Sequence, residues 1–284
     1  MQLNYADLLS KINFVIMVYE TRIIAFIDIL GFKNIIDDSL IGDITDDQKE
    51  IKRIYDTISL AREVLSMDDN KQNEIIESMR ITHFSDSFII SFQFNEKSGV
   101  FFILLRLLWL SFTFAFNGFL CRGALTIGKI VHDEKVVFGL GLVSAYQLES
   151  KKAKYPRIIL DKKIIAIGQR FHGEQHDSDF ERKSIEEIVT KDKDNFYYID
   201  YISKAKDEFD CPECDFQVYI SNLKKITERG LKSDCKRIIK KYEWLKEKLN
   251  QIIKHYKSDF TIKQLEESGF DDLADFYRKL EIIE

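Results

Sequence analysis

Proline is scarce in this sequence, with only two among 284 residues, and cysteine is limited to four. So few prolines argue against a long disordered linker between domains. The amino-terminal segment also lacks the basic start, apolar run and small-residue cleavage site of a secretory signal. We therefore expect a cytoplasmic protein whose thiols are reduced.

A basic excess is also missing, because the formal net charge at pH 7 is −5. Proteins that bind along DNA or RNA usually carry a basic face, so we expect no nucleic-acid partner. A small nucleotide is still compatible with this charge, since it needs only a few local cations. Apolar residues (45%) and charged residues (31%) are balanced as in a globular chain. The length suits one large domain or a core with a smaller appendage.

The cysteines do not complete the pattern of a zinc site. Cys211 and Cys214 have the spacing of half a site, but only Cys235 follows them. His255 would be the fourth ligand, and its position matches no typical spacing. We therefore expect free thiols in a turn, with a bound metal as the alternative.

One apolar run is long enough to raise the question of a membrane span. Residues 100–116 are almost wholly apolar and are interrupted near the centre by Arg106. At roughly 17 residues the run is at the short limit for a span, and an arginine at its centre is costly in lipid. We expect a buried helix and no stable membrane insertion.

The hydrophobic pattern predicts an α+β fold. Residues 22–29 form a compact apolar run typical of a buried strand, and amphipathic helical patterns continue to about residue 67. The elements expected next are a hairpin at 77–94, the apolar helix, a strand pair at 118–127 and 129–138, a helix at 139–152 and a strand at 155–160. This order predicts a ferredoxin-like β-α-β-β-α-β core widened by extra strands.

We expect this core to occupy residues 1–163, with a short leading helix within residues 1–20. Residues 164–215 are expected to be mainly loops, and a further strand is expected at 196–202. Beyond residue 220, apolar side chains recur at helical spacing among many charges. Residues 164–284 are therefore expected to form a strand and loop region followed by a helical appendage.

Two aspartates lie where carboxylates are unusual. Asp28 is inside the apolar strand, and Asp86 is at the turn between two apolar strands. A buried carboxylate is costly unless it is paired or bound to a metal. In a split β-α-β fold the first strand ends beside this turn, so the two carboxylates can face each other and hold Mg²⁺ or Mn²⁺. The alternatives are a helix cap for Asp28 and a simple turn residue for Asp86.

Gly31 follows the first aspartate at the start of a helix. Glycine lets the backbone approach a ligand closely, and the amides that open a helix can bind a polyphosphate. The alternative is an ordinary turn between a strand and a helix.

Four segments resemble the motifs of class III nucleotidyl cyclases. Residues 26–32 (FIDILGF) resemble the first metal motif, and residues 84–87 (FSDS) resemble the second. Residues 122–128 (RGALTIG) and 139–149 (GLGLVSAYQLE) resemble the strand and the helix that follow in that family. The order and spacing agree from about residue 22 to residue 161, which is over half of the chain.

The resemblance implies a set of site residues. Asp28, Asp86 and the backbone carbonyl of Ile29 would hold two Mg²⁺ or Mn²⁺ ions, with Arg122 as a catalytic cation. Class III sites form between two catalytic domains, so a homodimer with shared active sites is implied. The substrate contacts expected in this chain are Phe26, Ile29, Gly31, Phe32, Arg80, Thr82, Lys154 and Arg157.

The chain departs from the family at several positions. The family helix normally presents an asparagine and an arginine to the ribose and the phosphates, and here those places hold Val143 and Gln147. The usual purine-reading residue is replaced by Thr82. The candidates for the missing cation are Arg122, Lys129, Lys152, Lys154 and Arg157.

The departures are similar to those of the pyrimidine cyclases of Pycsar anti-phage defence. The segments that carry this closer resemblance are Ser85-Asp86-Ser87, Arg122-Gly123, residues 153–158 (AKYPRI) and, more weakly, residues 242–245 (YEWL). The resemblance implies conversion of UTP or CTP to the 3′,5′-cyclic nucleotide, which a separate effector then reads. We expect UTP as the substrate.

Other functions are compatible with parts of the pattern. A cytidylate cyclase, a purine cyclase and a catalytically inactive nucleotide-sensing homologue share the expected fold. Thr82 disfavours the purine cyclase, and the intact Asp28 and Asp86 disfavour the sensor. A palm-domain polymerase or a diguanylate cyclase shares the element order, but the sequence lacks the acidic turn motif of those enzymes.

Overall fold

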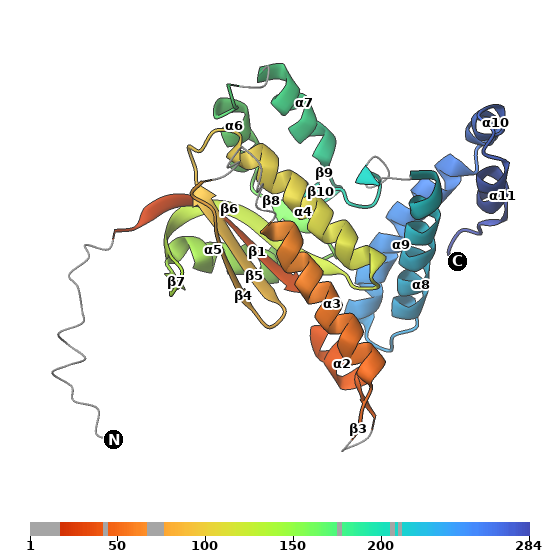
Figure 1. Ribbon diagram of the computed structural model, residues 1–284, viewed down its shortest axis with the longest axis horizontal. Helices are drawn as coiled ribbons and strands as arrows, with labels where there is room; N and C mark the ends of the chain where they lie inside the picture. The colour runs from red at the N-terminus through yellow and green to blue at the C-terminus, as the bar shows by residue number, and fades with distance from the viewer. Residues whose placement is uncertain (1–17, 42–44, 67–76, 175–177, 205–207, 210–211) are drawn as a thin grey trace.

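The computed structural model describes residues 18–41, 45–66, 77–174, 178–204, 208–209 and 212–284. These residues form a mixed α/β fold built around one large sheet (Figure 1). The expected α+β class agrees with this architecture. The sheet has eight strands, in the spatial order β4 (Arg80–Phe84), β5 (Ser87–Gln93), β1 (Glu20–Ile29), β6 (Cys121–His132), β8 (Ile158–Leu160), β10 (Tyr197–Ile199) and β9 (Val189–Lys191), with β7 (Val137–Phe138) paired to β6. A small second sheet joins β2 (Leu40–Ile41) to β3 (Thr45–Asp46). The leading helix expected within residues 1–20 lies largely outside the described residues.

Strand β1 lies in the interior of the sheet, antiparallel to β5 on one side and to β6 on the other. Strand β4 continues the antiparallel ladder, whereas β8 is parallel to β6. The helices α2 (Phe32–Asp38) and α3 (Gln48–Leu65) connect β1 to β4, and α4 (Gly99–Phe116) connects β5 to β6. The chain therefore has the β-α-β-β-α-β order that the sequence predicts.

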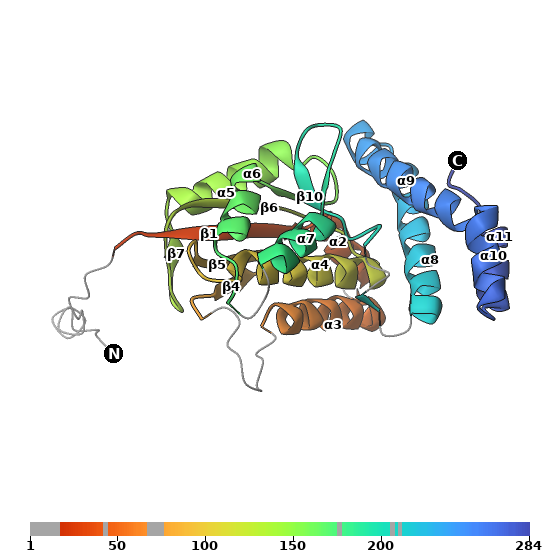
Figure 2. The same ribbon diagram turned by 90° about the horizontal axis from the view of Figure 1, so that it is seen from above.

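The two faces of the sheet are covered by different helices (Figure 2). Side chains alternate along a strand, and in β1 Ile23, Ala25 and Ile27 belong to the large core that contains α3 and α4. Ile24 and Phe26 belong to a smaller cluster with α5 (Leu140–Lys152). The same alternation places Asp28 on the α5 side of the sheet.

Helix α4 is long and apolar enough to cross a membrane by length and composition, but 67% of it is buried inside the fold. Arg106, the arginine within it, is also buried and donates to the Leu65 carbonyl at 2.9 Å. The buried helix expected at residues 100–116 is confirmed.

The strand pair expected at 118–127 and 129–138 is wrong in its boundary, because one continuous strand, β6, runs from Cys121 to His132 and only the two-residue strand β7 pairs back to it. Gly128 lies inside this strand and faces Gly141 of α5, where an added Cβ would come within 2.5 Å of the Gly141 Cα. Gly128 is therefore needed for close approach of a helix to the strand rather than for a turn.

The sheet continues past residue 163, where the sequence places the end of the core, because β10 pairs with β8 and then with β9. The loops expected between residues 164 and 188 are instead α6 (Lys162–Arg170) and α7 (Ser178–Ile188). These short helices are stabilised by tertiary packing, and Gly168 of α6 lies directly against Val100 and Ile185. Local sequence pattern alone gives little indication of helices held in this way.

The carboxyl-terminal part of the chain is helical, as expected (Figure 1). It consists of α8 (Pro212–Leu231), α9 (Lys236–Tyr256), α10 (Asp259–Glu267) and α11 (Asp271–Lys279). Helix α8 packs against α9 and against α4, where the Asn222 amide donates to the Phe116 carbonyl at 2.9 Å. The first half of α9 lies against the loop between β9 and β10.

Candidate active site

The fold brings Asp28 and Asp86 together. Asp28 is the next-to-last residue of β1 and is opposite Ser87 in the register with β5. Asp86 lies in the tight turn between β4 and β5, and its carbonyl accepts a hydrogen bond from the Ile29 N–H at 3.1 Å. The Asp86 carboxyl is close enough to Asp28 to raise the pKa of Asp28 through its charge and a side-chain hydrogen bond. The sequence predicted this arrangement from the order of the elements.

The electrostatics of the pair favour a shared proton when no cation is present. Burial raises the pKa of Asp28 to about 7, and the charge and hydrogen bond of Asp86 and the charge of Glu149 act in the same direction. The positive charge of Arg122 lowers the pKa of Asp28 and so opposes these effects. Two carboxylates this close cannot both ionise freely unless a cation lies between them.

A divalent cation fits this donor set, because it can replace the proton between two carboxylate oxygens. Among the described residues no group of three or more His, Cys, Asp or Glu side chains is arranged to hold a metal. The protein would therefore supply Asp28 and Asp86, and the Ile29 carbonyl as predicted. Water and phosphate oxygens would complete the coordination, which is the usual mode for Mg²⁺.

Manganese binding is expected to weaken as the pH falls below about 7, by roughly tenfold per pH unit, because a proton on the carboxylate pair competes with the cation. Titration calorimetry with Mn²⁺ at pH values on both sides of about 7 measures this. The Asp28→Asn variant should lose both the tight binding and its pH dependence. A wild-type affinity that stays flat across the range would contradict the shared proton.

Arg122 connects the carboxylate pair to α5. It is opposite Asp28 in the register with β1, and its Nη2 lies 3.7 Å from the Asp28 Oδ2. Its Nε forms a close ion pair with Glu149, whose side chain is only 2% exposed. The sequence expected a partner for Arg122 but did not identify Glu149. The spacing Gly141, Ala145, Glu149 could have indicated it, because residues four apart share the buried face of a helix.

Three predicted substrate contacts lie on the α5 side of the sheet: Phe26 on β1, next to α5, and Arg80 and Thr82 on β4. In the strand registers Thr82 is opposite Ile89, and Ile89 is opposite Phe26. The Phe26 ring makes an edge contact with Tyr146 of α5, at 5.5 Å between centroids. Arg80, two residues from Thr82 on β4, is exposed.

The Thr82 hydroxyl is held by a residue that sequence reasoning missed. His132, at the end of β6, contacts the Thr82 Oγ1 through Nε2 at 2.9 Å and the Ser91 Oγ through Nδ1 at 2.8 Å. Burial and the charges of Arg22 and Arg80 lower the pKa of His132 to about 4, so the ring is neutral at physiological pH. No local pattern identifies His132, because its contacts depend on the register of strands distant in sequence.

Gly31 and Phe32 form the turn that follows the carboxylate site. Gly31 has a φ of 75°, in the left-handed region that glycine adopts without strain, and an added Cβ there would meet no atom within 4 Å. Phe32 begins helix α2 and packs against the large core. Both residues follow Asp28 closely in the chain, and their role in substrate binding stays a prediction.

Arg157 is a correction to the predicted set of substrate contacts. Its side chain is fully buried and is ion-paired with Asp192 and Asp194, in the loop between β9 and β10. The guanidinium also lies over the rings of Tyr155 and Trp244. A charge enclosed in this way has no access to a substrate, so Arg157 joins the sheet to α9.

Lys154, by contrast, is exposed and lines a cavity beside α9 together with Arg122. The two places where the family carries an asparagine and an arginine, Val143 and Gln147, are exposed on α5. Cys211 lies outside the described residues, and the side chain of Cys214 is not among those described. Cys235 is a free, exposed thiol at the start of α9.

Comparison of the chain with models of protein families gives no match, and comparison with curated proteins gives none either.

Proposed function

We propose that the chain is a class III nucleotidyl cyclase that converts UTP to 3′,5′-cyclic UMP and pyrophosphate. The observation that carries the proposal is the pairing of Asp28 with Asp86 at the end of β1, where the Ile29 N–H donates to the Asp86 carbonyl in the turn between β4 and β5. A protein that only binds nucleotides has little reason to hold two facing carboxylates, because each is costly to bury without a cation. The alternatives are CTP as the substrate and a catalytically inactive sensor.

The topology supports a cyclase core of the ferredoxin-like type. The spatial order β4-β5-β1-β6 is antiparallel throughout and places the first strand between the hairpin and the strand after α4. The four motif segments occupy the end of β1, the turn after β4, the strand β6 and the helix α5. In this proposal residues 1–163 form the catalytic core, and the later strands and helices extend it.

In the proposed reaction the ribose 3′-oxygen forms a bond to the α-phosphorus, and the bond from that phosphorus to the leaving pyrophosphate breaks. The hydroxyl proton passes to solvent. Two Mg²⁺ or Mn²⁺ ions, when bound by Asp28, Asp86 and the Ile29 carbonyl, would acidify the hydroxyl and neutralise the triphosphate. Arg122, beside Asp28, is placed to stabilise negative charge that develops on the phosphate.

The α5 side of the sheet would receive the nucleoside. Phe26 offers an apolar edge, and Thr82 offers a hydroxyl whose position is fixed by His132. Uracil and cytosine differ in donors and acceptors at two neighbouring ring positions, so one oriented polar group can discriminate between them. Arg80 is an exposed cation on β4 two residues from Thr82, whereas Lys154 lines the cavity beside α9.

A homodimer is proposed because apolar side chains are exposed at the tip of the β4–β5 hairpin and along the outer face of α5. Phe84 at the tip of the hairpin is 80% exposed, and Leu140 at the start of α5 is 78% exposed. Val143 and Tyr146 follow Leu140 at helical spacing and are also exposed. A second copy of the chain that covers this surface would complete two shared sites by two-fold symmetry.

The proposed setting is the cytoplasm of a cell under phage attack, where the cyclic nucleotide would be read by a separate effector protein. The proposal includes no nucleic-acid partner, in keeping with the net charge of −5. It also includes no membrane insertion, because α4 is used as a core helix.

The proposal is tested by incubating the purified protein with Mn²⁺ and each of the four ribonucleoside triphosphates, and by identifying the products by mass spectrometry. Cyclic UMP is expected, and it should be absent for Asp86→Ala and retained for Asp56→Asn, an exposed control on α3. Cyclic CMP would select the cytidylate alternative, and a cyclic purine nucleotide would overturn the pyrimidine assignment. Tight nucleotide binding without any cyclic product would favour the inactive sensor.

A further inference from the structure

A cavity of about 1090 Å³ lies between the core and the carboxyl-terminal helices. Its wall is formed by the segment after α5, the loop between β9 and β10 and the first half of α9, and Arg122 of the carboxylate site also lines it. We call it the α9 cavity. Neither the motif segments nor the proposed reaction assigns a function to α9.

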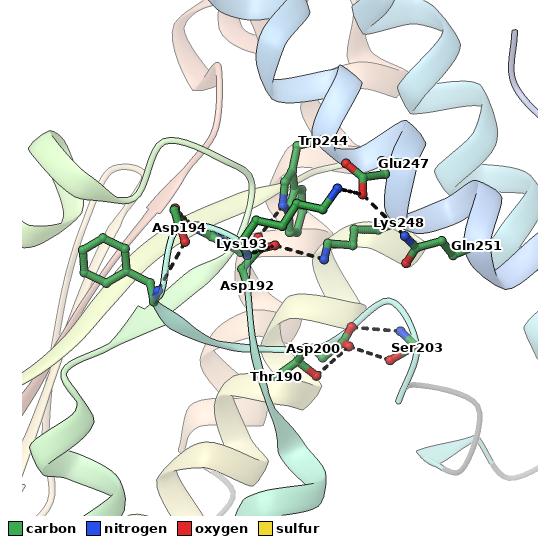
Figure 3. A network of polar contacts seen from close by, with 12 residues as sticks. Thr190, Asp192, Lys193, Asp194, Asp200, Ser203, Trp244, Glu247, Lys248 and Gln251 are labelled. Atoms are coloured by element: carbon green, nitrogen blue, oxygen red, sulfur yellow. Dashed lines mark hydrogen bonds and ion pairs between the residues drawn. The ribbon is translucent and has the colours of Figure 1, made fainter.

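Most of the negative charge in the α9 cavity is already neutralised. Asp192 and Asp194 are ion-paired with Arg157. Asp192 also accepts hydrogen bonds from the indole of Trp244 and from Lys248 (Figure 3). Glu247 is ion-paired with Lys193 in the same network. Glu243 is the fourth carboxylate of the wall and is exposed to solvent.

The positive charge of the cavity is not neutralised in the same way. Four of its cations form no ion pair within the described part of the chain: Lys154, Arg237, Lys240 and Lys241. Burial and the nearby charge of Arg122 lower the pKa of Lys241, whose ammonium is therefore close to a like charge. Like charges collected around a cavity indicate an anionic ligand.

The amino end of α9 gives a second, independent indication. Cys235 is its N-cap residue, and the first turn contains no acidic residue that would complement the helix dipole. The backbone N–H groups of Ile238 and Arg237 lower the pKa of the Cys235 thiol, so this end of the helix favours a negative charge. The first turn of α9 contains Lys236 and Arg237 in place of acidic residues, and these cations are unfavourable at the positive end of the helix dipole. A bound anion would interact with the N–H groups and offset this repulsion.

The α9 cavity extends to Arg122, whose Nη2 lies 3.7 Å from the Asp28 Oδ2 of the carboxylate site. The charges of Asp28 and Glu149 also act on Lys241 and raise its pKa, against the effects of burial and Arg122. We propose that the α9 cavity binds the pyrophosphate end of the nucleoside triphosphate, with Arg237, Lys240 and Lys241 as the phosphate-binding cations. This inference rests on the proposed function for the identity of the nucleotide.

The proposal gives the carboxyl-terminal helices a specific role. Where family members place an asparagine and an arginine on the helix that corresponds to α5, this chain has Val143 and Gln147. Cations from α9 in the same chain supply the charge that these two side chains do not. The appendage then completes the phosphate subsite of the core to which it is attached.

The direct test is calorimetric titration with inorganic tripolyphosphate, without nucleotide and at physiological ionic strength, with sulfate as the control anion. The double variant Lys240→Ala/Lys241→Ala is expected to bind tripolyphosphate about tenfold more weakly or worse, since charge-assisted phosphate contacts are lost. Lys246→Ala is the matched control, because Lys246 is on the same helix and outside the α9 cavity. Thermal unfolding of both variants verifies that the fold is retained.

A second readout uses the exposed thiol in the cavity wall. Tripolyphosphate is expected to slow alkylation of Cys235 by iodoacetamide, followed on its own peptide by mass spectrometry. In the nucleotide assay the double variant should raise the KM for UTP more than Lys246→Ala does. Absence of tripolyphosphate binding, or equal binding by the double variant, overturns the inference even if cyclic UMP is formed. Binding that the double variant loses, without any cyclic product, contradicts the cyclase proposal and leaves the anion site standing.

Discussion

Replacement of Asp28 by asparagine is expected to abolish cyclic nucleotide formation while making the metal-free protein more stable above about pH 7. The rate should fall by about a thousandfold or more, because the amide cannot supply the charge that binds the cations. Asparagine can still make a hydrogen bond to Asp86. Steady-state kinetics in Mn²⁺ and thermal unfolding in chelator measure the two effects.

The gain in stability follows from the sign of the pKa shift. The pKa of Asp28 is raised from 3.8 to about 7 by folding, so the folded protein holds a proton that the unfolded chain releases. Stability from this group is therefore present below about pH 4 and is lost as the pH rises to about 7. The Asp28→Asn substitution removes that loss. A variant that is less stable than wild type at pH 8 in chelator would contradict the carboxylate repulsion described here, whereas Asp56→Asn should change neither property.

Replacement of Arg157 by alanine is expected to lower the free energy of unfolding by about 3–5 kcal/mol, because it leaves the buried carboxylate of Asp192 without its ion pair. Asp194 and the stacked rings around the guanidinium lose the same partner. Urea unfolding followed by circular dichroism measures the change. If the variant does not fold, Asp192→Asn tests the same ion pair by removing the charge of the other partner.

Arg182→Ala is the matched control for Arg157. Arg182 is an exposed arginine on α7 with two surface ion pairs, and such pairs contribute little. Its replacement should leave the unfolding transition almost unchanged. An equally small change in the free energy of unfolding for both variants would show that the contacts of Arg157 with Asp192, Asp194 and Trp244 do not stabilise the fold.

The carboxylate site could be predicted from sequence because its parts are close to one another in the element order. A compact apolar strand, a turn and a returning strand fix where Asp28 and Asp86 lie once β1 pairs with β5. The buried helix α4 was predictable for a similar reason, since its composition alone requires burial. In both cases the local pattern and the final environment agree.

The other contacts depend on packing between distant segments. Arg157 is expected in the site because it belongs to the segment 153–158 that carries the resemblance, yet the loop at 192–194 and the helix α9 enclose it. His132 reaches Thr82 only because β6, β1, β5 and β4 lie side by side in one register. The strand β6 was divided at Gly128 because a glycine in sequence does not reveal a helix that packs against it.

The contact between the core and α9 contains a tryptophan, Trp244, whose fluorescence depends on that contact. The sequence contains two tryptophans. Trp109 is on α4 and donates to Glu208 at 2.6 Å, whereas Trp244 lies parallel to Tyr155 at 5.5 Å and forms part of the cavity wall. Tryptophan emission depends on the local environment of the indole, so α9 carries a fluorophore that senses both its own docking and the occupancy of the cavity beside it.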